Sequence, residues 1–320
     1  MKSSLDHKPK LTIFTAPKPF LDSHVSIIQR NALLNWVNLG EVIKVVVVGD
    51  EPGIREICEE IGVEHISEVH CNEYGTPMLS SIFSLAHRAN DAPLMAYCNA
   101  DILFLSDLLD AVDGLLELCQ PFLGVGQRWD LDIQKSVDFS SDWELDISRL
   151  IRSKGKKHEQ SGSDYFIFSK QSFLNIPDFS VGRAGWDNWM IYKARWHHWP
   201  VIDLTNSLTA IHQNHDYSHL AGGRKHYFQP ESTVNVKLGG GRRTIFTLID
   251  TTHEFKNGSL QRKKLDRKSF FRRIETFPLV GLRSKFLGSL AFILLHPIKA
   301  FNEIKGWLTY KINVVLGKID

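Results

Sequence analysis

Asn99 and Asp101 stand one residue apart directly after an apolar run, in the stretch LMAYCNADILFLSDLL (residues 94–109). Burying a lone carboxylate is costly unless the charge is paired, so a polar pair is unusual between two apolar segments. Either the strand ends there and the pair caps a turn, or the two side chains hold a ligand. Their oxygen atoms are the kind of ligand that Mg²⁺ and Mn²⁺ prefer.

Two further clusters carry groups that can do chemistry. Asp187 lies in GWDNW (residues 185–189), where it either caps a helix or acts as a base, since a helix N-terminus favours an anion. The run HQNHDYSH brings together His212, His215 and His219. This spacing is compatible with zinc, but no Cys lies nearby, so one catalytic metal ligand with loop histidines is the favoured interpretation.

The first 110 residues alternate between strand and helix patterns, which predicts a parallel sheet with helices on both faces. In such sheets ligands bind at the carboxyl ends of the strands, where the polar residues of this sequence gather. No GxGxxG follows the first strand, so a Rossmann dinucleotide site is disfavoured. The expected strands are 11–16, 42–50, 63–69 and 92–102, and the expected helices begin at 22 or 23 and cover 51–62 and 76–90.

Charge divides the chain into an acidic body, residues 1–255, and a basic tail, residues 256–320. The tail has 14 Lys and Arg against 4 Asp and Glu, whereas the whole chain has 38 against 36. In the body, residues 122–133 are expected to form a strand that runs into a loop, with further strands at 163–170 and from Pro200 and a helix from about Trp186. We therefore expect one α/β domain with a helical extension.

Composition indicates a globular cytoplasmic protein. Apolar residues make up 43% of the chain and charged residues 23%, and the four Cys form no CxxC pair. The opening MKSSLDHKPK lacks the apolar segment of a secretory signal, and no apolar run reaches the length of a membrane span.

The predicted sheet with Asn99-Ala100-Asp101 after its fourth strand resembles the GT-A nucleotide-sugar glycosyltransferases over roughly residues 10–250. In that family an Asp-X-Asp motif at this place holds a divalent metal that bridges the two phosphates of the donor. The resemblance implies a GT-A-like, mostly parallel central sheet flanked by helices, with Mn²⁺ or Mg²⁺ bound by Asp101 and by a late His, here His212. GWDNW is similar to a Gly-Trp-acidic segment that such enzymes place beside the acceptor.

Asn99 departs from the family pattern, because it has a carbonyl oxygen but no charge. It would contact the metal or the ribose. Asp50 would reach the base or ribose, or instead cap the following helix, and the basic loop at Arg224 and Lys225 would close over the diphosphate, or else be a solvated loop. The residues expected to bind the nucleotide-sugar are Thr15, Ala16, Lys18, Asp50, Asn99, Asp101, Arg224 and Lys225.

The resemblance predicts transfer of a sugar from a nucleotide-sugar to a hydroxyl of a glycan or lipid-linked acceptor. A UDP-sugar is the favoured donor. Asp187 is the expected base, with Asp164 as the second candidate, and Trp186 and Trp189 would stack on the acceptor sugar. Each of these residues also has a purely structural interpretation: Asp187 as a helix cap, Asp164 as a turn residue and the two tryptophans as core residues. Two rival hypotheses are a nucleotidyltransferase of related fold and a retired transferase-like domain that only binds glycans.

The tail predicts one more property. After Pro297, apolar residues recur at three- and four-residue steps with lysines among them, and an upstream cluster, residues 262–273, is basic and aromatic. Such a segment can lie on an anionic membrane surface, or it can pack on the body or on a second subunit. We expect a cytoplasmic or peripheral membrane location and no nucleic-acid partner; the oligomeric state stays open.

Overall fold

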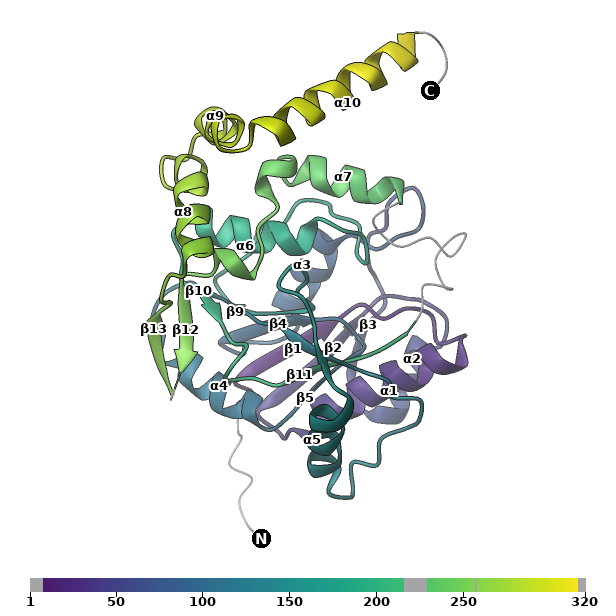
Figure 1. Ribbon diagram of the computed structural model, residues 1–320. Coiled ribbons are helices and arrows are strands. Elements are labelled where there is room, and N and C mark those ends of the chain that lie inside the picture. Colours follow the sequence, from purple (N-terminus) through teal and green to yellow (C-terminus); the bar gives the residue numbers. More distant parts are fainter. Residues whose placement is uncertain (1–7, 216–228, 257, 316–320) are drawn as a thin grey trace. The chain divides into compact units, whose positions relative to one another are not determined.

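The structure is a computed structural model that describes residues 8–215, 229–256 and 258–315. Figure 1 shows these residues as a ribbon, with the remainder as a thin grey trace.

The chain divides into two compact units. The first unit contains residues 1–194 and 199–263, and the second contains residues 195–198 and 264–320. The boundary predicted from the sequence falls after residue 255, and the paired strands at the end of the first unit extend to Arg262.

A nine-stranded sheet forms the centre of the first unit, in the order β13-β12-β10-β6-β9-β4-β1-β2-β3. The strands β3, β2, β1 and β4 run parallel, and β9 lies antiparallel between β4 and β6. This mostly parallel sheet confirms the fold class predicted from the alternating strand and helix patterns. The strands are β1 (Leu11–Thr15), β2 (Ile43–Val48), β3 (Glu64–Ile66), β4 (Leu94–Cys98), β6 (Leu123–Val125), β9 (Tyr165–Ser169), β10 (Val201–Asp203), β12 (His253–Lys256) and β13 (Ser259–Arg262).

A second, four-stranded sheet has the order β5-β11-β7-β8. Its strands are β5 (Ile102–Phe104), β7 (Arg128–Leu131), β8 (Lys156–Lys157) and β11 (Ala210–Gln213). The apolar residues that follow Asp101 in the sequence are therefore a strand of this smaller sheet. Asn99 and Asp101 occupy the short connection that leads from one sheet to the other.

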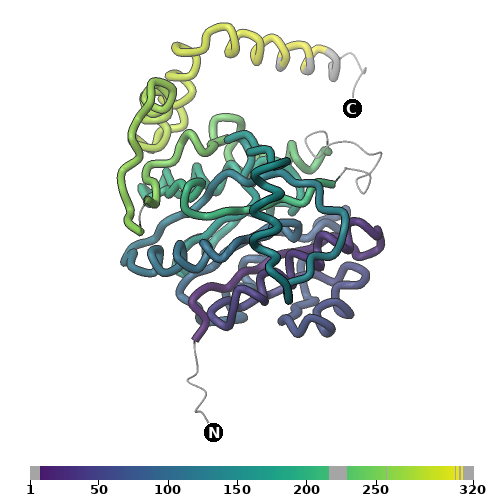
Figure 2. Tube along the Cα trace, turned by 60° about the horizontal axis from the view of Figure 1, so that its bottom comes forward, coloured from purple at the N-terminus to yellow at the C-terminus, as the bar shows by residue number. Residues whose placement is uncertain are grey.

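Helices cover both faces of the large sheet. Figure 1 shows α3 and α6 on one side of it and α1 and α4 on the other, and Figure 2 shows the teal segment that contains α5 at the front, where α5 contacts β7. The helices of this unit are α1 (Ser23–Asn38), α2 (Ile54–Ile61), α3 (Leu79–Ala89), α4 (Asp107–Leu116), α5 (Trp143–Lys154), α6 (Trp186–Trp196) and α7 (Pro230–Leu238), with two short 3-10 helices, η3 (Arg242–Thr244) and η4 (Leu248–Asp250).

The two faces of the sheet differ in composition because successive strand residues point in opposite directions. On the α3 face the rings of Phe14, Phe83 and Phe168 pack together, and Phe14 and Phe83 have centroids 4.9 Å apart. On the α1 face, Leu11 and Ile13 of β1 belong to a larger core cluster that includes Ala32, Leu33 and Trp36 of the helix. Both faces are thus closed, and only the strand ends remain for a ligand.

Helix α1 fixes the small sheet through buried polar side chains. It begins where the sequence predicts, with Asp22 as N-cap, and Val25, Ile28, Ala32 and Trp36 are buried. The Asn35 amide donates to the Phe104 carbonyl at 3.0 Å and accepts from the Phe104 N–H at 2.8 Å, and the Trp36 indole donates to the Ile102 carbonyl at 3.0 Å. These bonds hold β5, and with it the connection that carries Asp101.

The helix expected over residues 76–90 begins later, at Leu79. Pro77 lies in an extended bridge with Cys71, and the Pro77 carbonyl accepts a hydrogen bond from the Val181 N–H at 3.0 Å. A residue before proline is biased toward extended backbone. Here Thr76 and Pro77 continue an extended segment that lines the cavity described below.

The second unit contains three helices in its described residues: α8 (Arg267–Val280), α9 (Lys285–Leu295) and α10 (Pro297–Val315). Asp266 caps α8 by accepting from the Ser269 N–H at 2.7 Å, and Ser284 caps α9 in the same way through the Leu287 N–H. Within the described part of the chain, no helix is both long and apolar enough to cross a membrane.

Replacement of Asn35 by Leu should destabilise the first unit by about 2–4 kcal/mol, since it leaves the N–H and carbonyl of Phe104 buried without partners. Denaturant unfolding followed by circular dichroism measures the loss. The control is Asn38→Ala on the exposed side of the same helix, where the effect should stay within about 0.5 kcal/mol. Equal stability of Asn35→Leu and the wild-type chain would contradict this role for Asn35.

Candidate functional site

A cavity of about 990 Å³ opens at the carboxyl ends of the parallel strands of the first unit. The loop after β1 lines it with Ala16 and Lys18, the connection after β4 with Asn99 and Asp101, and the start of α6 with Asp187. An open α/β sheet keeps its ligand sites at this edge because the loops there diverge.

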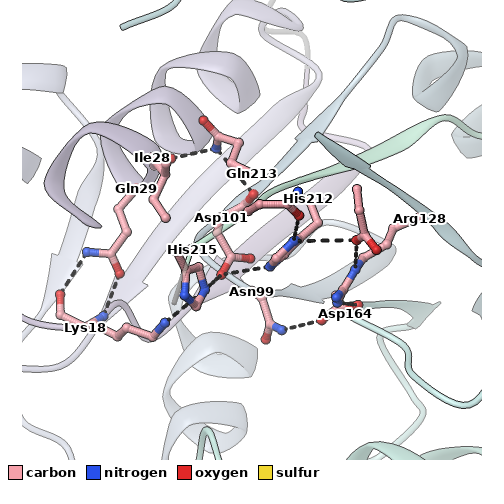
Figure 3. Close-up of polar contacts among 12 residues, drawn as sticks. Lys18, Ile28, Gln29, Asn99, Asp101, Arg128, Asp164, His212, Gln213 and His215 are labelled. Carbon is pink, nitrogen blue, oxygen red and sulfur yellow. Dashed lines mark hydrogen bonds and ion pairs between the residues drawn. The ribbon is translucent and has the colours of Figure 1, made fainter. Parts of the chain in front are cut away.

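Asp101, His212 and His215 form a compact group in this cavity, and their candidate ligand atoms all lie within 4.8 Å of one another. Figure 3 shows Asp101 between the two imidazoles. Asp101 Oδ2 lies 3.2 Å from His215 Nε2 and 3.8 Å from His212 Nε2. The antiparallel pairing of β11 with β5 places His212 opposite Ile102, the residue after Asp101.

Asp101 stays ionised in this setting. Burial would by itself raise the pKa of the Asp101 carboxyl, but His212, a hydrogen bond from His215 and the charge of Lys18 together hold that pKa well below its usual range. Burial also lowers the pKa of His212, although the nearby Asp101 carboxylate opposes this shift, and an imidazole in its neutral form can act as a metal ligand.

The second carboxylate oxygen of Asp101 supports the same assignment. Asp101 Oδ1 is buried and has no hydrogen-bond partner among the described residues, although buried polar atoms are rarely left so. A carboxylate with two imidazoles suits a transition-metal dication better than Mg²⁺, which prefers oxygen ligands. These residues therefore fit a divalent cation, and His215, which the sequence suggested only as part of a zinc site, lies beside Asp101 together with His212.

Asn99 is held by a second charged group. Its Nδ2 donates to Asp164 Oδ1 at 2.9 Å, and Asp164 forms an ion pair with Arg128. Arg128 Nε donates to Asp130 Oδ1 at 2.9 Å, and His158 Nδ1 lies 2.8 Å from Asp130 Oδ2. Asp164 thus places a carboxylate beside the position where the sequence has Asn in place of Asp, while the bonded Asn99 amide is fixed in orientation.

The pKa of Asp187 is shifted in the opposite direction to that of Asp101. Burial raises the pKa of the Asp187 carboxyl to about 6, although the N–H groups of Asn188 and Gly185 oppose the rise. Asp187 Oδ1 accepts from the Gly185 N–H at 3.2 Å, which orients the carboxyl at the start of α6. Gly185 has a φ of 108°, a backbone conformation that glycine adopts readily. A carboxyl with a pKa of about 6 can exchange a proton close to neutral pH.

Lys18 is positioned by α1. Gln29 accepts from the Lys18 N–H at 2.7 Å and donates to the Lys18 carbonyl at 3.0 Å, so the loop after β1 has a defined path (Figure 3). The Lys18 ammonium lies 3.2 Å from His215 Nε2. It brings positive charge into the same cavity.

The two tryptophans that were expected to stack on the acceptor sugar lie in different environments. Trp186 lines the cavity and packs edge-on against Tyr97, with ring centroids 5.1 Å apart. Trp189 is buried against Phe179, with centroids 5.1 Å apart, and is not among the cavity residues. A role for either in acceptor binding stays a prediction.

The remaining predicted residues are spread more widely. Ala16 lines the cavity, whereas Thr15 is buried in β1 and Asp50 lines a smaller cavity of about 400 Å³ beside Glu51. Arg224 and Lys225 lie outside the described residues. Their assignments stay predictions.

The sequence analysis missed Arg128, Asp130, His158 and Gln29. One signal was present in the sequence: Arg128 and Asp130 carry opposite charges two residues apart, which places them on the same face of a strand. Gln29 has no such signal, because its role depends on where the loop after β1 passes.

Comparison of the sequence with protein-family models and with curated proteins gives no match. Solved structures do resemble it. A mannosyltransferase from Pyrobaculum calidifontis, PcManGT in complex with GDP-Man and Mn²⁺, is 13% identical, with a TM-score of 0.39 over 64% of this chain and 56% of that one. TarS from S. aureus is 14% identical, with a TM-score of 0.42 over 64% of this chain and 37% of that one.

Glucosyl-3-phosphoglycerate synthase from Mycobacterium tuberculosis, in complex with Mg²⁺ and UDP, is 12% identical, with a TM-score of 0.39 over 65% of this chain and 72% of that one. A glycosyltransferase is thus among the solved structures to which this chain is similar, as the resemblance seen in the sequence implies.

Replacement of Asp101 by Asn or of His212 by Ala should weaken Mn²⁺ binding at least about tenfold, because each removes a ligand. Calorimetry or electron paramagnetic resonance of Mn²⁺ measures this directly. The control is Asp113→Asn, whose carboxylate pairs with Lys10 at 2.7 Å on the surface and is not among the cavity residues. The wild-type protein should prefer Mn²⁺ to Mg²⁺. Wild-type Mn²⁺ affinity in both site variants would rule out this metal assignment.

Proposed function

We propose that this protein is a cytoplasmic GT-A-like glycosyltransferase. It transfers the sugar of a nucleotide-sugar, a UDP-sugar in the first instance, to a hydroxyl group of a glycan or lipid-linked acceptor, with a divalent metal. The observation that carries the proposal is a pair of carboxylates in one cavity whose pKa values are shifted in opposite directions, Asp101 downward and Asp187 upward.

Opposed pKa values of this kind separate two roles in one site. Asp101 remains charged and is suited to hold a cation. Asp187 is ionised above about pH 6 yet keeps enough affinity for a proton to accept one. Glycosyl transfer from a nucleotide-sugar needs both functions, because a diphosphate must leave and an acceptor hydroxyl must lose its proton.

The donor end of the cavity would bind the diphosphate. A divalent cation held by Asp101, His212 and His215 would offset the negative charge of that group. Lys18 adds a positive charge on the same side, beside His215. Asn99, whose Nδ2 is bonded to Asp164, has a carbonyl oxygen that would accept a hydrogen bond from a ribose hydroxyl.

The acceptor end would lie near the start of α6. As the acceptor oxygen bonds to the anomeric carbon, the bond from that carbon to the diphosphate breaks, and the diphosphate leaves with the electron pair. Asp187 takes the proton of the acceptor hydroxyl. Orientation of the two substrates and stabilisation of the leaving charge would supply most of the rate.

The turnover number should fall as the pH falls through about 6, since the active form of Asp187 is the ionised one and its pKa is raised to about 6. Asp187→Asn should remove this pH dependence and lower kcat by roughly 10² to 10⁴, with little effect on donor affinity. Steady-state rates between pH 5 and 8, together with calorimetry of UDP-sugar binding, measure both effects.

The matched control for that variant is Asp178→Asn, since Asp178 accepts from the Ser80 hydroxyl on the surface. It should leave both kcat and the pH profile unchanged. Near-normal turnover in Asp187→Asn would show that Asp187 is a helix cap and not the base.

Nucleotide release tests the function as a whole. The full chain is incubated with Mn²⁺ and a panel of UDP- and GDP-sugars, and the released UDP or GDP is measured with and without candidate acceptors. Release from at least one donor, lost in Asp187→Asn, supports glycosyl transfer. Release of pyrophosphate from a sugar phosphate and a nucleoside triphosphate would instead indicate a nucleotidyltransferase, and glycan binding without turnover would indicate a retired domain.

A further inference from the structure

The second unit exposes an unusual amount of apolar surface on α9 and α10. Phe286 and Leu294 of α9 are 77% and 71% exposed, and Ile298 of α10 is 76% exposed. Contiguous exposed apolar surface of this kind marks an interaction site in soluble proteins. The exposed large apolar residues of the two helices are Phe286, Leu287, Leu290, Ile293, Leu294, Leu295, Ile298, Phe301, Ile304, Leu308 and Ile312.

The packing of α8 on α9 decides which side of α9 is left open. Gly288 is buried, and a Cβ at this position would come within 2.8 Å of Leu279 of α8, so the two helices meet closely there. Phe286 and Leu290 each lie two residues from Gly288, which turns them to the opposite side of α9, and Leu294 continues this row four residues further on. Within this unit they therefore form an outer face.

Helix α10 continues the apolar surface. Ile298, Phe301, Ile304, Leu308 and Ile312 follow each other at steps of three or four residues, which places them along one side of the helix. All five are exposed, whereas Ala300 is buried within the structure. Helix α10 therefore has an apolar stripe that the other helices of its unit leave uncovered.

The unit is strongly basic as well as apolar. Between residues 264 and 315 there are ten Lys and Arg against three Asp and Glu. Asp266 is engaged as the cap of α8, and Glu275 pairs with Arg272 at 3.2 Å and with His296 at 3.4 Å. A partner for this unit must therefore be both apolar and anionic.

We propose that the outer face of α9 and the apolar stripe of α10 lie in the headgroup region of an anionic lipid bilayer. Apolar side chains at this depth reach the acyl chains, and the lysines of the same helices meet the lipid phosphates. A second copy of this unit fits less well, because it would bring an equal positive charge against the first. The proposal does not depend on the proposed glycosyl transfer.

Vesicle sedimentation of the full chain tests the proposal. Vesicles of phosphatidylcholine alone are compared with vesicles that also contain phosphatidylglycerol, at low and high salt. The wild-type protein should sediment at least tenfold more with the anionic vesicles, and less at high salt, since screening weakens the attraction of exposed charges. Wild-type protein that stays in the supernatant at low salt would overturn the proposal.

Variants separate this face from the rest of the chain. F286E with L294E should abolish sedimentation, and so should I298S with F301S. Lys299, Lys305 and Lys311 changed together to Gln should reduce it. The controls are L21S and L174S in the first unit, where the wild-type side chains are 78% and 64% exposed; these should sediment as the wild type does.

Other occupants give different results. Dimers in solution that F286E with L294E converts to monomers, without any effect on sedimentation, would overturn the proposal in favour of a second copy. A lower melting temperature of the first unit in F286E with L294E, again with sedimentation unchanged, would overturn it in favour of packing within the chain.

Discussion

The buried carboxylate of Asp101 is the constraint around which the first unit is arranged. A charge in this position is tolerated only if positive or hydrogen-bonding groups surround it. They come from elements far apart in the sequence: His212 and His215 from β11 and the residues after it, and Lys18 from the loop after β1. Helix α1 supports both the small sheet and the loop after β1, because Asn35 bonds to β5 and Gln29 bonds to the backbone of Lys18.

Much of the architecture could be predicted from local patterns. Buried parallel strands are rich in apolar, β-branched residues, so the run around Val45 can be recognised as one of them. The alternation of such strands with helices then predicts a parallel sheet. The same logic places Asn99 and Asp101 at a carboxyl end. Asp187 is selected from the sequence as an acid directly after Gly-Trp at a helix start, a position that also suits a helix cap.

The remaining features depend on pairings that a sequence does not display. The antiparallel insertion of β9 brings Asp164 to Asn99, and the pairing of β11 with β5 brings His212 to Asp101. Neither partner is signalled locally, since register and strand order are decided by the whole sheet. Pro77 is a case of local chemistry misjudged: a proline tolerated in a first helical turn serves equally well in an extended segment.

The connection from β4 to β5 has a thermodynamic consequence. Asp101 and His212 belong to the small sheet and its approach, whereas Asn99, Asp164 and Asp187 stand at the margin of the large one. A molecule that touches both sets makes the two sheets unfold together, because opening either one releases it. Mass action then adds about 2.7 kcal/mol of stability at a hundredfold excess over the dissociation constant. Ligand binding in this cavity would thus make the unfolding of the two sheets more cooperative.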